Sequence, residues 1–370
     1  MAAALLALLA TAGSASAQTA SSPPSTAPRP TRTAAEIYDA ACAACHGPDG
    51  KGTPLAVRGF ELEPPDFSDC NFATREPDAD WGAIVHGGGP VRGFDRTMPS
   101  FGDALTEDEI ALAVSHVRTF CGDPSWPRGD LNLPRAIFTE KAYPEDEAVW
   151  TTGLNVTGDG EFSNEIVYEK RFGARNQIEI KAPFAVAHQP GSTWMGGAGD
   201  IGLGFKRAFY HDMSKGRIAA FGGEVVLPTG DESSGIGSGA LRFEPFASFG
   251  QILRYDAFFQ AQGGAEISAN ENNAGHEAFW RLVVGRTWVQ GRYGRAWTPM
   301  VELLAARELE SGAKIEWDLV PQVQVTLNQR QHLMLNVGLR MPVSVREGRS
   351  TSLMVYFLWD WFDGGLRDGW

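Results

Sequence analysis

Two cysteines and a histidine lie together near the N-terminus, in the order Cys42-Ala-Ala-Cys45-His46. Thiols separated by two residues lie one helical turn apart, which suits their addition to the two vinyl groups of haem, and the adjacent imidazole can ligate the iron. A thioredoxin-like redox pair or half of a zinc site is the alternative, but neither needs the histidine and no second C-x-x-C follows. The motif therefore predicts one covalently bound haem c.

A methionine further along the chain could complete the coordination of the iron. Met98 precedes Pro99 in a Gly-rich, irregular stretch, which is typical of a loop that carries a thioether to the open face of haem iron. Methionine often fills gaps in a core instead, and His86 and His116 compete for the position. We predict Met98 as the sixth ligand and place His116 on the last helix of this region, at the surface or in helix packing.

Helix signals flank these ligands. Thr33 with Glu36 and Thr106 with Glu109 are S/T-x-x-E capping boxes. They predict one helix that runs into the cysteine motif and a second that ends near Cys121. Glycines after the motif break the first helix and allow the chain to pass close to the haem edge.

The stretches CAACHGPDGKG, MPSF and LTEDEIALAVSHVRTF resemble a class I cytochrome c over residues 34–121. The resemblance implies an all-α domain with His46 as proximal and Met98 as distal ligand. It also implies that the Pro54 carbonyl accepts a hydrogen bond from His46 Nδ1. With both axial positions filled, electron transfer is favoured over catalysis, whereas a haem enzyme such as a peroxidase would need an open iron site.

The first residues of the chain predict export. A short apolar stretch ends at the small-residue site Ala15-Ser16-Ala17, so we predict a signal peptide over 1–17. An inert disordered tail is the alternative. Residues 18–33 are rich in Ser, Pro, Thr and Ala and predict a flexible tether.

Cys70 and Cys121 lie outside the haem motif. In an oxidising periplasm, two such cysteines in one domain favour a disulfide over two free thiols. We predict that they pair, and we assign them no catalytic role.

Acidic residues exceed basic ones, and the formal net charge is −13. Residues 34–141 alone contain 9 basic and 18 acidic residues. This excess argues against nucleic acid as a partner, because phosphate binding needs a basic face. It suits a basic redox partner or metal cations, and equally a solvated surface.

From about residue 148 the hydrophobic pattern changes to period two, which is typical of β-strands. The alternation is regular over 177–186, 314–328, 332–341 and 353–361. We expect roughly twelve segments of about ten residues, the length that crosses a bilayer as a tilted strand.

A soluble sandwich would alternate as well, but three features favour a membrane barrel. Large apolar residues occupy one face of nearly every strand, whereas Glu165, Glu169 and Glu179 lie on the other, as in a wet lumen. Short connections, such as 173–176, alternate with long ones, such as 188–199, as periplasmic turns alternate with extracellular loops. Tryptophans near strand ends are typical of interfacial girdles: Trp280, Trp288, Trp297, Trp317, Trp359 and Trp361.

The stretches GGAGDIGLGFKRAFY and EVVLPTGDESSGIGSG resemble a family of outer-membrane barrels assigned to transport in phenol-degradation pathways. The resemblance covers about 196–262 and implies an outer-membrane barrel without a defined substrate. The order of haem motif and barrel is similar to that of the fused cytochrome-porins of iron-oxidising bacteria.

Taken together, these patterns predict a multidomain chain with a class I monohaem cytochrome c domain over 34–143 and an antiparallel outer-membrane β-barrel over 148–370. We expect electron transfer at the outer membrane, with the cytochrome on the periplasmic side. The expected partners are a periplasmic redox protein and an extracellular or lumenal electron donor such as a metal ion. The alternative is a transport pore for small solutes, with the cytochrome as a redox plug or anchored electron carrier.

Overall fold

The structure is a computed structural model of the chain, and it describes residues 32–158, 160–188, 194–232 and 236–370. Residues Thr33–Trp370 form one compact unit. The predicted signal peptide over 1–17 lies outside the described residues, as does the predicted tether except for its last two residues.

Short helices form the described chain up to residue 131. Thr33 and Thr106 each close a capping box with the glutamate three residues later, so two helices begin where the sequence predicts. No helix among the described residues has the length and apolar character needed to cross a bilayer. The helices in chain order are α1 (Ala34–Ala41), α2 (Ala43–His46), α3 (Leu55–Arg58), α4 (Cys70–Ala73), α5 (Asp78–Gly87), η2 (Gly89–Arg92), α6 (Glu107–Phe120) and η3 (Gly129–Leu131).

The core of this helical region lies between α1 and α6. Ile37 and Tyr38 of α1 are fully buried, and Ile110, Ala113 and Val117 on one face of α6 are buried with them. Val114 is buried as well, and the spacing of Ile110, Val114 and Val117 is the helical pattern that the sequence shows. The two capped helices therefore hold the segment that carries the cysteine motif.

A disulfide joins Cys70, at the start of α4, to Cys121, which follows α6. The two cysteines are 51 residues apart in sequence. The bond therefore connects the middle of the helical region to its last helix.

Removing this disulfide should destabilise the helical region. Closing a loop of this length lowers the entropy of the unfolded chain, which corresponds to about 4 kcal/mol of stability. We expect the double variant Cys70→Ala, Cys121→Ala to unfold at a lower urea concentration than the wild type. Unfolding of the helical region is followed by near-UV circular dichroism. Reduction of the wild-type chain should have the same effect, and reduction of the variant should have none. An unchanged midpoint in both would contradict the prediction.

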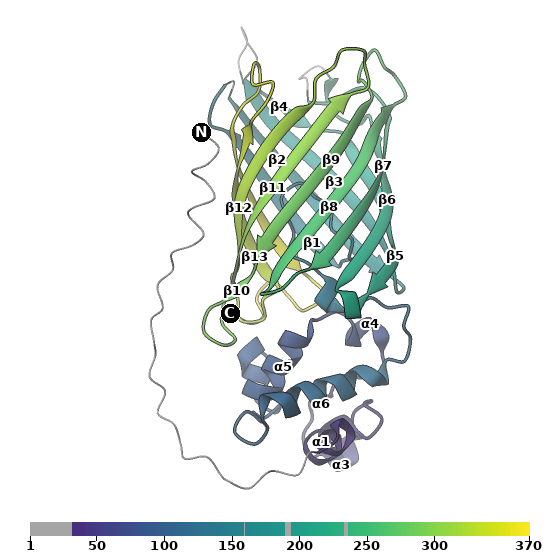
Figure 1. Cartoon of the computed structure of the whole chain (residues 1–370), viewed down its shortest axis with the longest axis vertical. Coiled ribbons are helices and arrows are strands. Elements are labelled where there is room, and N and C mark those ends of the chain that lie inside the picture. The colour runs from purple at the N-terminus through teal and green to yellow at the C-terminus, as the bar shows by residue number, and fades with distance from the viewer. Residues whose placement is uncertain (1–31, 159, 189–193, 233–235) are drawn as a thin grey trace. The chain divides into compact units, whose positions relative to one another are not determined.

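The rest of the described chain forms antiparallel strands that close into a barrel (Figure 1). The strands are β1 (Glu147–Asn155), β2 (Glu161–Phe172), β3 (Asn176–His188), β4 (Trp194–Ala198), β5 (Ile201–Asp212), β6 (Arg217–Leu227), β7 (Arg242–Ile252), β8 (Ala257–Ser268), β9 (Glu277–Arg286), β10 (Trp288–Val289), β11 (Ala296–Glu308), β12 (Glu316–Thr326), β13 (Leu333–Pro342) and β14 (Ser352–Asp360). A short 3₁₀ turn, η4 (Met213–Lys215), connects β5 to β6.

The barrel has twelve strands, as predicted. β4 and β5 pair in turn with β3, and β9 and β10 pair in turn with β11, so each of these two pairs is one interrupted strand. The first and last strands close the barrel in a register that runs from Glu147 opposite Asp360 to Asn155 opposite Ser352. Closure gives each described strand two neighbours, apart from the short β4 and β10, which pair only with β3 and β11. A closed sheet is a requirement for β-structure in a bilayer.

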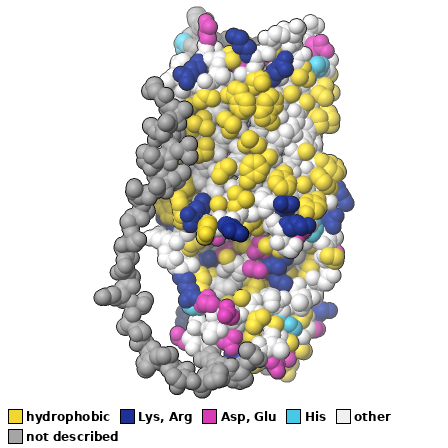
Figure 2. Space-filling view, viewed as in Figure 1, with side chains coloured by type: hydrophobic (Ala, Val, Ile, Leu, Met, Phe, Trp, Pro, Cys, Tyr) yellow, Lys and Arg dark blue, Asp and Glu magenta, His cyan; other side chains and the backbone are white. Residues whose placement is uncertain are grey.

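The two faces of the barrel differ in chemistry as the period-two pattern predicts. Figure 2 shows hydrophobic side chains gathered over the strands on one side of the molecule. The exposed apolar residues on the outer wall include Phe162, Ile166, Ile178, Ile180, Leu203, Phe205, Phe221, Phe243, Leu282, Val284 and Val301. The buried polar residues on the inner wall include Glu169, Gln177, Glu179, Lys206, Gln260, Gln262, Glu302, Gln322, Gln324 and Asn336. An apolar exterior and a polar interior are typical of a transmembrane barrel.

Candidate haem site and barrel lumen

The cysteine motif lies on a helical bend. Cys42 ends α1 and precedes α2, which contains Cys45 and His46. The backbone N–H groups of both Cys45 and His46 donate to the Cys42 carbonyl, at 3.1 and 2.9 Å, so the two thiols and the imidazole are held within one turn. Gly47 follows with φ of 75° and accepts a 2.7 Å hydrogen bond from the buried Tyr38 hydroxyl. A glycine suits this left-handed position because it has no Cβ.

Burial controls the protonation of the motif. It lowers the pKa of His46, so the ring is neutral, as an iron ligand must be. Burial, together with the neighbouring Cys45, raises the pKa of the Cys42 thiol to about 11. The His46 ring stacks on Phe67, with 4.8 Å between ring centroids, and Phe67 in turn contacts Trp81. These aromatic rings shield the imidazole from water.

The motif residues fit a covalently attached haem. The donor set is two thiols and an imidazole in the order that haem c requires. His46 Nδ1 is buried and has no hydrogen-bond partner among the described residues. The carbonyl of Pro54 accepts instead from the backbone N–H groups of Val57 and Arg58, so its bond to His46 stays a prediction.

Met98 lies in the loop between α5 and α6 that the sequence predicts. Its side chain is partly buried, and its carbonyl accepts a 3.0 Å hydrogen bond from the backbone of Gly89. The competing histidines have other contacts. His86 lies 5.2 Å from the ring of Tyr293 in the barrel, and His116 lies 5.0 Å from Tyr38 in the helical core. Ligation by Met98 stays a prediction.

Replacing Met98 with alanine should leave haem attached but remove one axial ligand. We expect a high-spin absorption spectrum and a reduction potential lower by on the order of 0.2 V, within the span of about 0.8 V that axial ligands set. Visible spectroscopy and redox titration of the purified chain measure both. The matched control is His86→Ala, which should keep the low-spin spectrum. If His86→Ala changed the spectrum and Met98→Ala did not, the assignment would be wrong.

Several contacts join the helical region to the turns of the barrel. Arg92 of η2 donates 2.7 Å hydrogen bonds both to the carboxylate of Asp80 and to the carbonyl of Tyr293, in the turn between β10 and β11. Arg330, in the turn between β12 and β13, donates to the carbonyl of Gly93 at 3.0 Å, and its guanidinium lies over the Phe94 ring. These turns lie at the short-connection end of the barrel.

A cavity of about 350 Å³ lies where the helical region, the turns and the lumen meet. Its lining includes the carboxyl groups of Glu76 and Asp363. Burial and the nearby carboxylates raise the pKa of Glu76 well above its ordinary value. Burial also raises the pKa of Asp363 to about 7, although Arg330 opposes the shift. Both groups therefore retain a proton more readily than an exposed carboxyl does.

The barrel interior is filled by residues 129–146, which we call the lumen segment. Its apolar side chains contact the wall in three directions. Leu131 packs against Ile218 of β6, and Leu133 packs against Phe258 of β8. Ile137 packs against a cluster formed by Val149, Val167, Tyr356 and Leu358, on β1, β2 and β14. A segment that touches strands around the whole barrel must lie inside it.

Polar contacts fix the same segment to the inner wall. Arg135 pairs with Glu147 at 2.5 Å and with Glu169 of β2 at 2.6 Å. Glu140 pairs with Lys206 of β5 at 2.5 Å. The carboxylates of Glu169 and Glu140 are therefore each paired with a cation inside the barrel.

Backbone atoms of the lumen segment are also bonded to the wall. The N–H groups of Ile137 and Glu140 donate to Gln322 and Gln262, at 3.1 and 3.0 Å. Gln260 donates to the carbonyl of Pro134 at 2.8 Å. An irregular segment inside a barrel has no ladder of its own, so the glutamines of the wall satisfy its backbone.

Sequence reasoning missed the role of the lumen segment. The domain boundaries predicted from the sequence divide it, since the predicted cytochrome domain covers 34–143 and the predicted barrel covers 148–370. One feature of the sequence could have indicated this role. Charged residues are frequent in the segment that follows the helical region: Arg135, Glu140, Lys141, Glu145 and Asp146. Charges at such density in a short connection are unusual for a plain linker, but their partners are not visible in the sequence.

Comparison with known proteins gives a family match in the helical region and similarities to solved structures in the barrel. Residues 29–117 match the family of cytochrome C oxidase, cbb3-type, subunit III, and no curated protein matches the chain. The barrel is similar to an outer membrane channel from Pseudomonas putida F1, with 11% identity over 61% of this chain and 99% of that chain and a TM-score of 0.44. It is also similar to the NanC porin, with 10% identity over 58% of this chain and 98% of that chain and a TM-score of 0.41. At these identities the substrates of the channels do not transfer to this chain.

Proposed function

We propose that this chain is an outer-membrane electron-transfer protein in which a monohaem cytochrome c is anchored by a closed, plugged β-barrel. One observation carries the proposal. The Cys42-Ala-Ala-Cys45-His46 motif, in which Cys42 is buried and Cys45 and His46 are partly buried, and a twelve-stranded barrel with an apolar exterior belong to the same polypeptide and the same compact unit. A haem c held at this motif supplies a one-electron iron couple. The match of residues 29–117 to a cytochrome family supports this assignment.

The outer wall supports insertion in a membrane. Its strands have the length that a tilted transmembrane strand needs, about 9–11 residues, and its exposed side chains are large and apolar. Aromatic residues lie at both ends of the wall. Trp288 and Trp297 face each other beside the turn that follows β10, whereas Trp280 and Trp317 meet near the opposite end of β11. Such girdles lie at the two membrane interfaces of outer-membrane barrels.

The turns support a proposed orientation of the chain in the membrane. The helical region contacts the turns around Tyr293 and Arg330, which are among the short connections. Short connections face the periplasm in outer-membrane barrels. We therefore propose that the helical region before the lumen segment, which carries the haem motif, lies on the periplasmic side and receives or delivers electrons there through a soluble redox partner.

The lumen segment favours an electron carrier over an open pore. Side chains fill the interior of small barrels, and in this chain the lumen segment adds a second layer of contacts around the wall. A solute pore would need this segment to move. We retain transport as the second candidate because the inner wall is strongly polar, with the cytochrome then acting as a redox plug or an anchored electron carrier.

The proposal is tested in cells that express the chain. Membranes are fractionated, and the heat-modifiable barrel band is stained for haem. Intact cells then receive a membrane-impermeant electron donor while haem absorbance is followed. Haem staining in the outer-membrane fraction and reduction of the haem support the electron-transfer function, with reduction from outside indicating a route across the membrane. A haem-free band, or leakage of small solutes at rates typical of open porins, would overturn it.

A further inference from the structure

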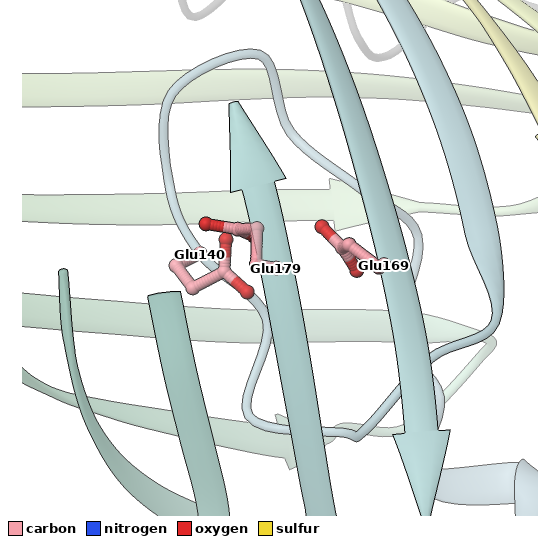
Figure 3. A group of neighbouring side chains, drawn as sticks. All are labelled: Glu140, Glu169 and Glu179. Atoms are coloured by element: carbon pink, nitrogen blue, oxygen red, sulfur yellow. The ribbon is translucent and has the colours of Figure 1, made fainter. Parts of the chain in front are cut away.

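Three glutamates from separate segments converge inside the barrel. Glu140 belongs to the lumen segment, Glu169 to β2 and Glu179 to β3 (Figure 3). One carboxylate oxygen of each lies within 4.8 Å of the others. Two ligands on opposite sides of a cation at about 2.4 Å are separated by twice that distance, so this spacing suits a single ion.

One oxygen of the group has no partner. Glu169 is fully buried, with 0% of its surface exposed. Its Oε1 accepts from Arg135 at 2.6 Å, but its Oε2 is buried and has no hydrogen-bond partner among the described residues. An unpaired carboxylate oxygen in the interior is costly, because it has lost its hydration without replacement. Glu140 likewise meets Lys206 through Oε1, and Glu179 meets Lys181 through Oε1.

The surrounding ion pairs leave an excess of negative charge. The glutamates of the group and the residues linked to them by ion pairs comprise six carboxylates and four cations, which leaves two negative charges. The carboxylates are Glu140, Glu145, Glu147, Glu169, Glu179 and Glu224, and the cations are Arg135, Lys141, Lys181 and Lys206. Glu140 and Lys206 balance each other. One negative charge remains among the ion pairs that include Glu169, and one remains among those that include Glu179.

From this geometry we propose that Glu140, Glu169 and Glu179 bind a divalent cation that fastens the lumen segment to the barrel wall. The ligands are carboxylate oxygens, which hard cations such as Mg²⁺, Mn²⁺ and Ca²⁺ prefer. A charge of two balances the excess of the network, and the ion supplies the partner that Glu169 Oε2 lacks. Because Glu140 is on the lumen segment and the other two ligands are on neighbouring strands, the ion joins the two parts directly. The site goes beyond electron transfer and does not depend on haem.

The test uses Mn²⁺ as the probe on the full-length chain, purified in detergent with its haem after treatment with a chelator. Free Mn²⁺ is measured by electron paramagnetic resonance during a titration, and Mg²⁺ and Ca²⁺ are added as competitors. We expect one bound Mn²⁺ per chain. Glu169→Gln and Glu140→Gln should each weaken binding by at least about tenfold, since the loss of even an outer partner of a metal ion costs about 10–100-fold in affinity.

Glu302→Gln is the matched control. Glu302 is also a buried lumenal glutamate that contacts the lumen segment, through Thr139, but it lies on β11 and outside the group. The Glu302→Gln variant should bind Mn²⁺ as the wild type does.

Heat-modifiable migration checks that each variant is folded. If Glu169→Gln does not fold, Glu140→Gln still tests the site, because it changes no residue of the barrel wall. Absence of a stoichiometric Mn²⁺, or equal affinity in Glu140→Gln and the wild type, would overturn the proposal. A haem-free variant should still bind Mn²⁺, so failure of the electron-transfer function would leave this result unchanged.

Discussion

Replacing Arg135 with methionine is expected to loosen the lumen segment and to let ions through the barrel. The guanidinium pairs with Glu147 and Glu169, whose side chains are 3% and 0% exposed. Methionine has a similar length without the charge, so two buried carboxylates lose their cation. Removing one partner of a buried ion pair costs about 3–5 kcal/mol.

Two measurements check this expectation. The urea midpoint of the purified chain should fall, and single-channel conductance in planar bilayers should rise from near zero to the level of a small open barrel. Arg207→Met is the control, because Arg207 is exposed on β5 and contacts Asn176 at the surface. A surface substitution of this kind changes stability by about 0.5 kcal/mol or less. If the Arg135 and Arg207 variants behaved alike, the lumen segment would not be held by its charges.

Replacing both Cys42 and Cys45 with alanine should abolish haem attachment while leaving the barrel assembled. The two thiols are the attachment points that the motif offers, and the other two cysteines are joined to each other as a disulfide. The strands close through β1 and β14 without any contribution from the cysteine motif. The expected result is complete loss of haem staining and of electron transfer, with heat-modifiable migration retained.

The control for this experiment is Met98→Ala, which should keep the stained band because the thioether bonds remain. A stained band in the double-cysteine variant would show that haem is held elsewhere in the chain. Loss of the folded barrel together with haem would instead show that the barrel cannot assemble without the haem region, and the anchoring proposal would then need a different basis.

The charged residues that fill the lumen are compatible with the proposed electron carrier, because an electron carrier does not need an open pore. Charges on the lumen segment have opposite charges as partners: Arg135 pairs with Glu147 and Glu169, Glu140 pairs with Lys206, and Asp146 pairs with Arg75 of the helical region. Buried charges are tolerated only when paired in this way. The segment therefore behaves as part of the barrel structure, and through the chain that follows α6 it connects the helical region to the barrel.

The sequence alone determined the parts of this protein that depend on neighbouring residues. The haem motif is contiguous, the capping boxes span four residues, and alternation in the strands is set by the period of an extended chain. Thus α1, α6, β12 and β13 begin within a few residues of their predicted positions. The twelve strands and their inward and outward faces follow from the same local rules.

Only the tertiary structure decided what fills the barrel and which charges meet there. Glu140 and Lys206 are far apart in the chain, and closure of the sheet brings them together. A glutamate that faces a lumen has the same place in the alternation as one that faces solvent, so the pattern cannot reveal a partner. The lumen segment has no period of its own, because it is held by the wall rather than by regular backbone bonds. Its position inside the barrel, where it fills the lumen, is therefore decided by the tertiary structure alone.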